Sequence, residues 1–432
     1  MIVRDPVHGD IEVGPEEREI LDTPQLQRLR GIKQTGTACL VYPGCVHTRF
    51  EHSLGTMATA KRIMDSLERV GFPPSPEDRL VVAAAALVHD VTHIPFGHTF
   101  EDERRIFPRH DSGHRLQHFV VDSALGEILR RHGVLGPVLK LLSPSPEPSP
   151  GQAWRAQLIS SCVDADLLDY LRRDAYFAGL SHNYDDRIFA HFLIADGQLA
   201  LNLVKHEMER PDARSEIMHL LRLRYFLTER VYTHHAKIAS GAMISRAVEL
   251  ARDDGLEERQ LWDLSDQTLP QFLKALGGPG SPAALLVEAV EGRRLLKRAY
   301  ILSSATVGRP RRLELIERYA GPGPERVELE RQLARTLGLG EHQVAVCCPP
   351  ESLFKEAGAL VRSRGGIRPL NTLDPGPAGE VRSLEEQYEN LWRFYVFVPP
   401  EHVGPAGRAC EELLGEPNEY RPKGEAWPGV EY

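Results

Sequence analysis

Hydrophobic residues recur at intervals of three and four along much of the chain, a spacing that places them on one face of an α-helix. Between residues 49 and 70 this stripe consists of Leu54, Met57, Ala58, Ile63, Met64 and Leu67. Residues 78–91 are apolar on nearly every face, which predicts a helix buried in the middle of a domain. The same periodicity predicts one helix over 154–178 and a long helical region over 219–250. The pattern indicates a mainly α protein.

Strand signals are confined to short stretches. β-branched and aromatic residues alternate at 199–204, 344–348 and 394–398, which predicts three strands. We therefore expect a helical domain over residues 1–250, followed over 251–432 by a helical extension and a small α+β region. Loops are predicted where Pro, Gly and Ser accumulate, at 143–151, 277–282 and 365–379.

The net charge and the length of the apolar runs exclude some classes of protein. Lys and Arg number 52 and Asp and Glu 61 among the 432 residues, and the net charge of −9 argues against a uniformly basic nucleic-acid-binding protein. A local basic groove for single-stranded nucleic acid is compatible with this balance. The longest apolar run, at 80–88, is about half of the roughly 20 residues that a bilayer span requires. We therefore expect no membrane segment and a cytoplasmic protein.

The cysteines and a basic stretch in the C-terminal third give two further predictions. The six cysteines include no C-x-x-C pair and are too few for a disulfide-stabilised fold, so we predict reduced thiols. The C-terminal third contains a basic stretch that suits a solvated face, an oligomer contact or a contact to phosphate. Its members are Arg293, Arg294, Lys297, Arg298, Arg309, Arg311 and Arg312.

The clustering of histidines is the strongest chemical signal. Five of the 18 histidines stand between residues 49 and 111, and one adjoins an aspartate; they are His52, His89, His93, His98 and His110, with Asp90. A second acidic cluster follows, at Asp164, Asp166 and Asp169. The apolar run before His89 carries Asp90 into the interior, and helical spacing places Asp166 on one face with Cys162 and Tyr170.

Buried carboxylates of this kind need a partner, because burying one unpaired costs several kcal/mol. Metal coordination is one of the few adequate compensations. The simplest donor set has two imidazole nitrogens and two carboxylate oxygens, which suits Fe, Mn, Zn, Co or Ni. It consists of His52, His89, Asp90 and Asp166.

Five segments carry a resemblance to a known family. They read DPVHG at 5–9, PQLQRLR at 24–30, HTRFEHSLG at 47–55, HDVTHIPFGH at 89–98 and DADLLDY at 164–170. In this order, over roughly residues 1–240, they resemble the HD-domain metal-dependent phosphohydrolases, in particular the branch of deoxynucleoside triphosphate triphosphohydrolases. That branch includes bacterial enzymes and the vertebrate SAM-and-HD-domain enzyme. The resemblance implies an HD-domain helical bundle as the catalytic domain.

The resemblance also implies roles for individual residues. His52, His89, Asp90 and Asp166 would hold a divalent cation (Mn, Fe, Zn, Co, Ni or Mg). The residues implied near the scissile phosphate, as phosphate ligands and general acid with a supporting carboxylate, are His93, His98, His110 and Glu101. Histidine suits this work because its ordinary pKa lies near neutrality.

Further residues are implied at the substrate. Arg49 would grip a phosphate; Gln34, Tyr170 and Asp174 would shape the sugar pocket; and Arg224, Tyr232 and His234 would approach the phosphates or the base. An activating nucleotide is implied at Asp22, Gln27, Arg28 and Arg30. The other interpretation of that segment is an Asp N-cap followed by a surface helix with Arg side chains.

Two positions depart from the branch. Leu167 stands where the vertebrate enzyme has a phosphate-binding Lys, and Thr228 stands where a substrate-facing His is expected. The implied reaction releases a deoxynucleoside and inorganic triphosphate from a deoxynucleoside triphosphate. The alternatives are an HD-type phosphodiesterase or nuclease, a nucleotide monophosphatase and, third, a non-catalytic nucleotide sensor. The family suggests a homo-oligomer.

Overall fold

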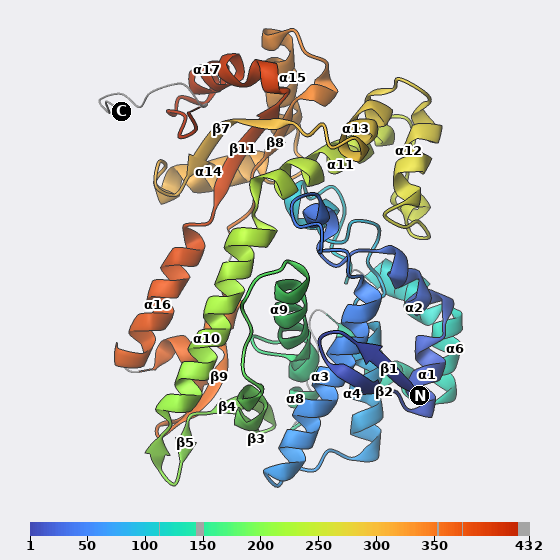
Figure 1. The fold of residues 1–432 in the computed structure, drawn as a ribbon, viewed down its shortest axis with the longest axis vertical. Coiled ribbons are helices and arrows are strands. Elements are labelled where there is room, and N and C mark those ends of the chain that lie inside the picture. Colours follow the sequence, from blue (N-terminus) through green and yellow to red (C-terminus); the bar gives the residue numbers. More distant parts are fainter. Residues whose placement is uncertain (112, 144–150, 352–353, 374, 422–432) are drawn as a thin grey trace.

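The computed structural model describes residues 1–111, 113–143, 151–351, 354–373 and 375–421. As predicted, the architecture is mainly helical with small sheets (Figure 1). The α-helices are α1 (Pro15–Leu21), α2 (Pro24–Arg28), α3 (Arg49–Arg69), α4 (Pro76–Val88), α5 (Gly113–Leu116), α6 (Ala124–Arg131), α7 (Leu135–Leu142), α8 (Ala153–Ile159), α9 (Ala165–Phe177), α10 (Pro211–Leu227), α11 (His235–Asp253), α12 (Thr268–Gly277), α13 (Pro282–Glu291), α14 (Arg309–Tyr319), α15 (Pro324–Leu337), α16 (Pro375–Glu389) and α17 (Val403–Leu414).

In the described parts of the chain, the strands form four small sheets. They are β1 (Ile2–Asp5), β2 (Gly9–Glu12), β3 (Phe192–Ala195), β4 (Gln198–Asn202), β5 (Val204–Lys205), β6 (Met208–Glu209), β7 (Lys297–Ser303), β8 (Ala345–Cys347), β9 (Leu360–Ser363), β10 (Gly366–Pro369) and β11 (Arg393–Val398). Two are antiparallel hairpins, β1-β2 and β5-β6, and the larger sheets have the orders β10-β9-β4-β3 and β7-β11-β8. The three predicted strands are confirmed, but the others were not predicted.

Helices α3 and α4 form the centre of the N-terminal half. α3 begins with a capping box between Thr48 and Glu51, and α4 begins with Ser75 as N-cap, Pro76 and a capping box to Asp78. Both helices bury most of their apolar residues. α3 packs against α4 and against α9. This packing brings the end of α4 and the start of α9 to the same side of α3.

The prediction of one helix over 154–178 is wrong. The structure has α8 and α9, separated by a turn at 160–164. Asp164 ends one helix and caps the next, because its carboxylate accepts the backbone N–H of Ser161 at 2.6 Å and of Leu167 at 2.7 Å. Cys162 lies in this turn, so it does not share a helical face with Asp166 as expected.

The helical region predicted over 219–250 is likewise interrupted. A π-helical turn, Thr228–Tyr232, ends α10, and α11 begins after His234. The Nδ1 atom of His234 accepts the backbone N–H of Ala236 at 3.2 Å, so this histidine serves as the N-cap of α11. In Figure 1, α10 lies between α9 and α16, and α11 lies against the three-stranded sheet, where it contacts β7 and β8.

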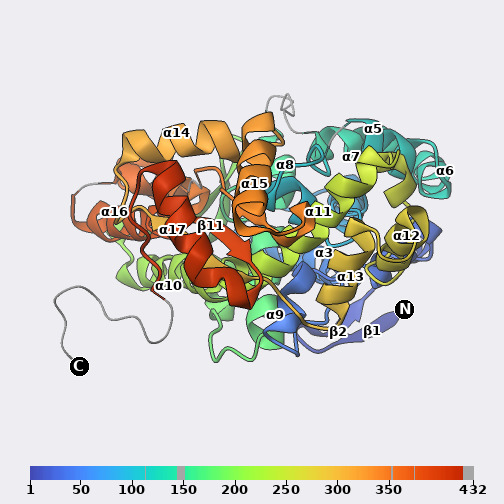
Figure 2. The ribbon, with the colours of Figure 1, turned by 90° about the horizontal axis from the view of Figure 1, so that it is seen from above.

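The hydrophobic core consists of two clusters. The larger runs from Ile11 to Phe397, and the smaller lies between residues 299 and 414 around β7, β11 and β8. α15 and α17 contact this sheet and lie beside β11 in the view from above (Figure 2). The parallel pairing of β4 with β9 joins the two halves of the chain. A domain boundary at residue 250 therefore stays a prediction.

The predicted loops had different outcomes. α12 ends at Gly277 and α13 begins at Pro282, which confirms the break at 277–282. The segment 365–379 contains β10 and the beginning of α16, so a loop throughout is wrong there. Most of 143–151 lies outside the described residues.

Within the described parts of the chain, no helix combines the length and apolarity needed to cross a bilayer.

Candidate metal centre and active site

Side chains from three helices converge on one point. His52 lies in α3, His89 and Asp90 directly follow α4, and Asp166 lies in the first turn of α9. The Nε2 atom of His52 is 2.9 Å from Asp166 Oδ1 and 3.7 Å from Asp90 Oδ2. His89 Nε2 is 3.8 Å from Asp166 Oδ1 and 3.6 Å from Asp90 Oδ1. The structure thus brings three of the four predicted ligands, His52, His89 and Asp166, within 4.8 Å of one another, and Asp90 lies beside the two rings.

The two imidazoles are oriented by hydrogen bonds on their far sides. His52 Nδ1 lies 2.7 Å from Asp169 Oδ2, and His89 Nδ1 lies 2.7 Å from the carbonyl oxygen of Ala86. Both acceptors favour the Nδ1–H tautomer, which points the Nε2 lone pairs inward. The two Nε2 atoms are only 3.2 Å apart. This separation is that of an N–H···N hydrogen bond when one ring carries a proton on Nε2, and it is also close to that of two nitrogen ligands on one divalent ion, so the donor set fits a metal.

Charge at this centre favours a cation as well. Burial alone would raise the pKa of Asp90, but Arg49, with Nη1 at 2.5 Å, holds it well below its usual range. Burial also acts to raise the pKa of Asp166, but the contact with His52 lowers it. For His52, burial acts to lower the pKa, yet hydrogen bonds to Asp166 and Asp169 raise it to about 10. The carboxylates thus retain a positive charge in their midst, which a metal ion can replace.

Asp169, which the sequence indicates only as part of an acidic cluster, orients the ring of His52. Besides His52, its carboxylate contacts His8 Nε2 at 2.6 Å and two nitrogens of Arg173 at 2.9 Å each. All four side chains of this network are buried or nearly so. Asp169 lies one helical turn after Asp166, and that spacing, together with the histidine of the DPVHG segment, was the available signal.

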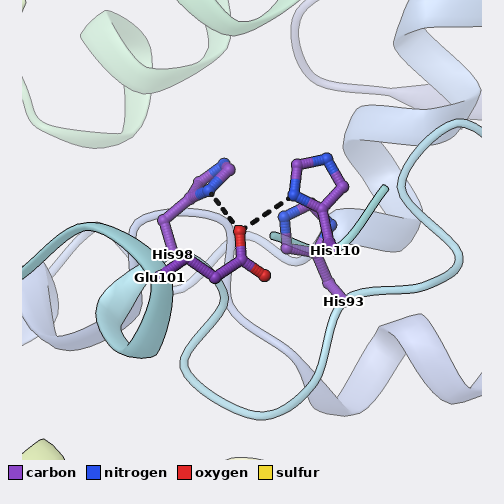
Figure 3. Close-up of side chains that lie close together, drawn as sticks. All are labelled: His93, His98, Glu101 and His110. Carbon is purple, nitrogen blue, oxygen red and sulfur yellow. Dashed lines mark hydrogen bonds and ion pairs between the residues drawn. The ribbon is translucent and has the colours of Figure 1, made fainter. Parts of the chain in front are cut away.

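A second cluster lies beside the first (Figure 3). Glu101 Oε2 is 3.0 Å from His110 Nδ1 and 3.3 Å from His98 Nδ1. His93 stacks on His110 with ring centroids 3.8 Å apart. Arg115 Nη1 donates to the other carboxylate oxygen of Glu101 at 3.0 Å. The structure therefore brings together the four residues predicted near the scissile phosphate.

Burial sets the charge state of this second cluster. Burial alone would raise the pKa of Glu101, but hydrogen bonds from His110 and His98 lower it far below its ordinary value. Burial lowers the pKa of His93 and of His110, so both rings tend toward the neutral form. His98 is the accessible member, with 42% of its side chain exposed.

Arg49 connects the two clusters through Asp90. Its Nη1 contacts Asp90 Oδ2, while Asp90 Oδ1 is 3.1 Å from His93 Nδ1. The Nε and Nη2 atoms of Arg49 are buried and have no hydrogen-bond partner in the described structure. A Cβ on Gly97, which has φ +57°, would lie 2.5 Å from Arg49 Nη2. The absence of a side chain at residue 97 therefore leaves room for the unpartnered edge of this guanidinium.

Most of the residues expected at the sugar, the base or the phosphates, besides Arg49, lie in or around α9. Tyr232 Oη donates to Asp174 Oδ2 at 2.6 Å, and His47 Nε2 contacts the other oxygen of Asp174 at 2.7 Å. The guanidinium of Arg224 lies 5.5 Å from the ring of Tyr170 and 5.4 Å from that of Tyr232. These side chains form one group.

Gln34 and His234 take different positions. The backbone N–H of Gln34 donates to the carbonyl of His47 at 3.0 Å, and its side-chain Oε1 is buried without a partner in the described structure. This oxygen is thus available to a donor on a ligand. The ring of His234 packs edge-on to Tyr42, 6.1 Å between centroids, while its Nδ1 caps α11.

The two departures from the family pattern have structural explanations. Leu167 is buried in the larger core cluster, so its side chain contributes to packing. The hydroxyl of Thr228 accepts from Arg224 Nη1 at 3.0 Å and donates to the Arg224 carbonyl at 2.9 Å. Arg224 Nε also contacts Glu356 at 3.3 Å, a residue from the C-terminal part that sequence reasoning missed.

The segment predicted to bind an activating nucleotide makes mostly intramolecular contacts. Arg28 donates through Nη2 to the carbonyls of Val91 and His93, both at 2.7 Å, so it supports the turn that carries the second cluster. Arg30 Nε donates to Gln27 Oε1 at 2.9 Å, and Gln27 Nε2 donates to the carbonyl of Leu21 at 2.9 Å.

The ends of this segment differ from the sequence interpretation. Asp22 is exposed and contacts Arg18 at 3.3 Å. The N-cap of α2 is Thr23, not Asp22.

In the basic stretch of the C-terminal third, Arg311 pairs with Glu314 and Arg312 pairs with Glu351. At least these two guanidinium groups therefore form intramolecular ion pairs.

Comparisons with known proteins identify two family regions in this chain. The model of the HD domain matches residues 49–174, and the model of the HD-associated region matches residues 217–423. An uncharacterized protein of Methanocaldococcus jannaschii is 27% identical over 410 residues, which cover 93% of this chain and 80% of that protein.

The deoxynucleoside triphosphate triphosphohydrolase SAMHD1 is also similar. The human protein is 29% identical over 289 residues, 59% of this chain and 45% of that protein, and the mouse protein is 29% identical over 286 residues, 57% and 43% respectively. The match thus spans less than half of each SAMHD1 chain.

Two solved structures share the fold. A phosphohydrolase from Bacteroides thetaiotaomicron has a TM-score of 0.66 at 23% identity, covering 92% of this chain and 100% of that chain. A hypothetical protein from Aquifex aeolicus has a TM-score of 0.68 at 22% identity, covering 94% and 98%. With its HD domain, the HD-associated region that follows and the fold of the HD-domain phosphohydrolases, the chain belongs to the HD-domain proteins.

Proposed function

We propose that this protein is a metal-dependent hydrolase of deoxynucleoside triphosphates that releases a deoxynucleoside and inorganic triphosphate. The observation that carries the proposal is the pair of inward-facing Nε2 atoms of His52 and His89, 3.2 Å apart and flanked by carboxylates. The similarity to SAMHD1, over 57–59% of this chain, supports the choice of substrate.

The metal ligands in this proposal are His52, His89, Asp90 and Asp166. A divalent cation held by them would offset negative charge on a phosphate and favour the ionisation of water. Asp169 fixes the ring of His52, and the Ala86 carbonyl fixes that of His89, so both donors are already oriented before the cation binds.

Arg49 is assigned the phosphate. Asp90 anchors one of its Nη atoms, and the free Nε and Nη2 atoms can donate two charge-assisted hydrogen bonds to phosphate oxygens. Since this edge is buried, the bonds form in a medium of low dielectric, which strengthens them. Arg49 thus grips the substrate without needing a Gly-rich phosphate loop.

His98 is assigned the role of general acid. It is the most exposed ring of its cluster, and Glu101 engages its Nδ1 side, which leaves Nε2 to deliver a proton to the leaving oxygen. Glu101 also engages His110, and His93 keeps a buried Nε2 without a partner in the described structure. We assign His93 and His110 to phosphate binding. Glu101 is assigned the positioning of the His98 and His110 rings around the phosphate.

The group of side chains around α9 is assigned the binding of the sugar and the base. Tyr170, Asp174 and Tyr232 form one wall, and Gln34 offers a free carbonyl oxygen to a hydroxyl. Arg224 is tied to Thr228 and Glu356, so its charge is partly compensated before a triphosphate arrives.

A second candidate reaction is hydrolysis of a nucleoside monophosphate or a phosphodiester, including single-stranded nucleic acid. Leu167 favours it, because a buried leucine cannot contribute the cationic phosphate contact that the resemblance expects at this position. An activating nucleotide near Asp22 to Arg30 and a homo-oligomer belong to the proposal as well.

The test is a substrate panel. The purified protein is assayed with Mn²⁺, Fe²⁺, Co²⁺, Zn²⁺, Ni²⁺ or Mg²⁺ against deoxynucleoside triphosphates, ribonucleoside triphosphates, monophosphates and single-stranded DNA, and the products are separated by chromatography. We expect deoxynucleoside and triphosphate in equal amounts, and no turnover with His52→Ala. Turnover of monophosphates or DNA alone would establish the second reaction, and absence of metal stimulation for every substrate would overturn both.

A further inference from the structure

We propose that His93, His98, Glu101 and His110 form a second cation site, of the nitrogen-rich kind that takes Zn²⁺, next to the His52–His89–Asp166 centre. One ligand atom from each of the four side chains lies within 4.8 Å of all the others. The part of the proposal that concerns inhibition rests on the proposed function, whereas the site itself does not.

Two of the distances between donor atoms match those expected around a tetrahedral ion. Zn²⁺ lies about 2.0–2.1 Å from nitrogen ligands, so two ligands of a tetrahedron are about 3.3–3.4 Å apart. Glu101 Oε2 is 3.3 Å from His98 Nδ1 and 3.0 Å from His110 Nδ1. These three side chains point toward one another, with His98 and Glu101 at the π-helical turn Thr99–Glu103 and His110 in the segment that follows it (Figure 3). All four donor atoms lie within 4.8 Å of one another, so rotation of the histidine rings would close the tetrahedron around an ion.

The fourth ligand and the supporting contacts are also in place. His93 is fully buried, its Nδ1 contacts Asp90 at 3.1 Å, and its Nε2 has no hydrogen-bond partner within the described residues. A buried nitrogen with a free lone pair is costly, and a metal ion satisfies it. Arg115 holds Glu101 Oε1 at 3.0 Å, which fixes the carboxylate and leaves Oε2 as the ligand.

The donor chemistry distinguishes the two centres. Three imidazoles and one carboxylate favour Zn²⁺, Ni²⁺ or Cu²⁺ over Mg²⁺ and Ca²⁺, which prefer oxygen. The first centre has two imidazoles and two carboxylates and accepts a wider range of metals. Asp90 lies between them, with Oδ2 near His52 at 3.7 Å and Oδ1 near His93 at 3.1 Å. The accessible ring of His98 gives the ion a way in.

Occupation of this site has a consequence for the proposed catalysis. A ring bound through Nδ1 carries its single proton on Nε2 and cannot become an imidazolium. His98 would then lose the doubly protonated form from which it delivers a proton to the leaving group. We therefore expect Zn²⁺ at the second site to inhibit hydrolysis that another metal supports at the first.

Metal stoichiometry tests the site independently of activity. The full chain and its variants are dialysed against Zn²⁺, and the bound metal is counted by atomic emission. We expect two Zn²⁺ per chain in the wild type, one in His52→Ala, one in His98→Asn and none in the double variant. His132→Asn, a histidine that contacts Glu19 at the surface, serves as the matched control and should keep two.

Cobalt adds a spectroscopic measurement. The visible absorption of Co²⁺ depends on coordination, so the second equivalent bound by the wild type should give a band that His98→Asn lacks and His52→Ala keeps. Glu101→Gln should behave like His98→Asn, and thermal unfolding of each variant shows whether it folds. A single Zn²⁺ in the wild type, or two in folded His98→Asn, would overturn the second site.

Activity separates the two proposals. If the site exists and the proposed function is right, Zn²⁺ beyond the first equivalent should lower Mn²⁺-supported triphosphate release at least tenfold. If two ions bind but no phosphate ester is hydrolysed under any condition, the function fails and the site stands. If hydrolysis occurs with one ion bound at saturating Zn²⁺, the function stands and the site fails.

Discussion

Replacing Gly97 by alanine should disable Arg49 without touching a metal ligand. Gly97 has φ +57°, and a Cβ built on it would lie 2.5 Å from Arg49 Nη2 and 3.2 Å from Arg49 Cζ and Nε. Real Cβ atoms do not come this close, so the guanidinium must move. The displaced atoms include the two nitrogens that we assign to the phosphate.

The magnitude follows from two separate terms. A left-handed backbone costs a residue with a Cβ roughly 1–2 kcal/mol, which should lower the melting temperature by a few degrees. A hydrogen bond to a charged group contributes about 1.5–3 kcal/mol. Since about 1.4 kcal/mol is a factor of ten, loss of the phosphate grip should lower kcat/KM roughly 10- to 100-fold.

A matched control separates strain from contact. Gly133 has φ +73°, and a Cβ there meets no atom within 4 Å, so Gly133→Ala carries similar backbone strain far from any phosphate contact. Kinetics by chromatography, metal content and thermal unfolding are measured for both variants. We expect similar losses of stability and unchanged metal content in both, and lower kcat/KM in Gly97→Ala alone. A Gly97→Ala protein with wild-type kcat/KM would refute the assignment of Arg49.

Three further predictions address the metal centre and the link to the C-terminal part. His52→Ala should lose the first metal and turnover while the helices persist, as checked by atomic emission and circular dichroism; a fully active variant would contradict the ligand assignment. Asp169→Asn should weaken metal binding by about 10- to 100-fold, since it removes the charge that orients His52; a metal titration with unchanged affinity would show that this contact has no role. Burial acts to raise the pKa of Glu249, but Arg104 and Arg326 lower it below its ordinary value. The ionised Glu249 carboxylate therefore stabilises the fold near neutral pH. This contribution is lost as the pH falls below about 4 and the carboxylate is protonated. Glu249→Gln should therefore lower the free energy of unfolding by about 3 kcal/mol at pH 7, and this difference should shrink in acid; a difference that is constant with pH would contradict the ionised pair.

The position of the metal ligands could be predicted largely from local sequence. The apolar run that forms α4 ends beside His89 and Asp90, and an apolar stripe defines α3 around His52. These patterns reflect short-range periodicity, which the chain itself imposes. The break before α9 was missed because Asp164 acts through hydrogen bonds to the backbone, and periodicity does not report them.

The partners of the ligands were less accessible to prediction. His8 and His52 meet at Asp169 although the two contacts span 161 and 117 residues. Arg28, expected at a nucleotide, donates to carbonyls of the turn at Val91 and His93. Such contacts depend on how the helices pack. The sequence gives the residue types but does not show which residues form hydrogen bonds with each other.

The sequence by itself determined that α3, α4 and α9 would present histidines and aspartates suited to a cation, because residue type and helical period are local properties. Only the tertiary structure decided that the Nε2 atoms of His52 and His89 face each other, that Glu101 joins two further histidines, and that Glu356 from the C-terminal part reaches Arg224. The reason is physical: a side chain's hydrogen-bond partner and its burial are set by the packing of segments far apart in the chain, and no local pattern encodes that packing.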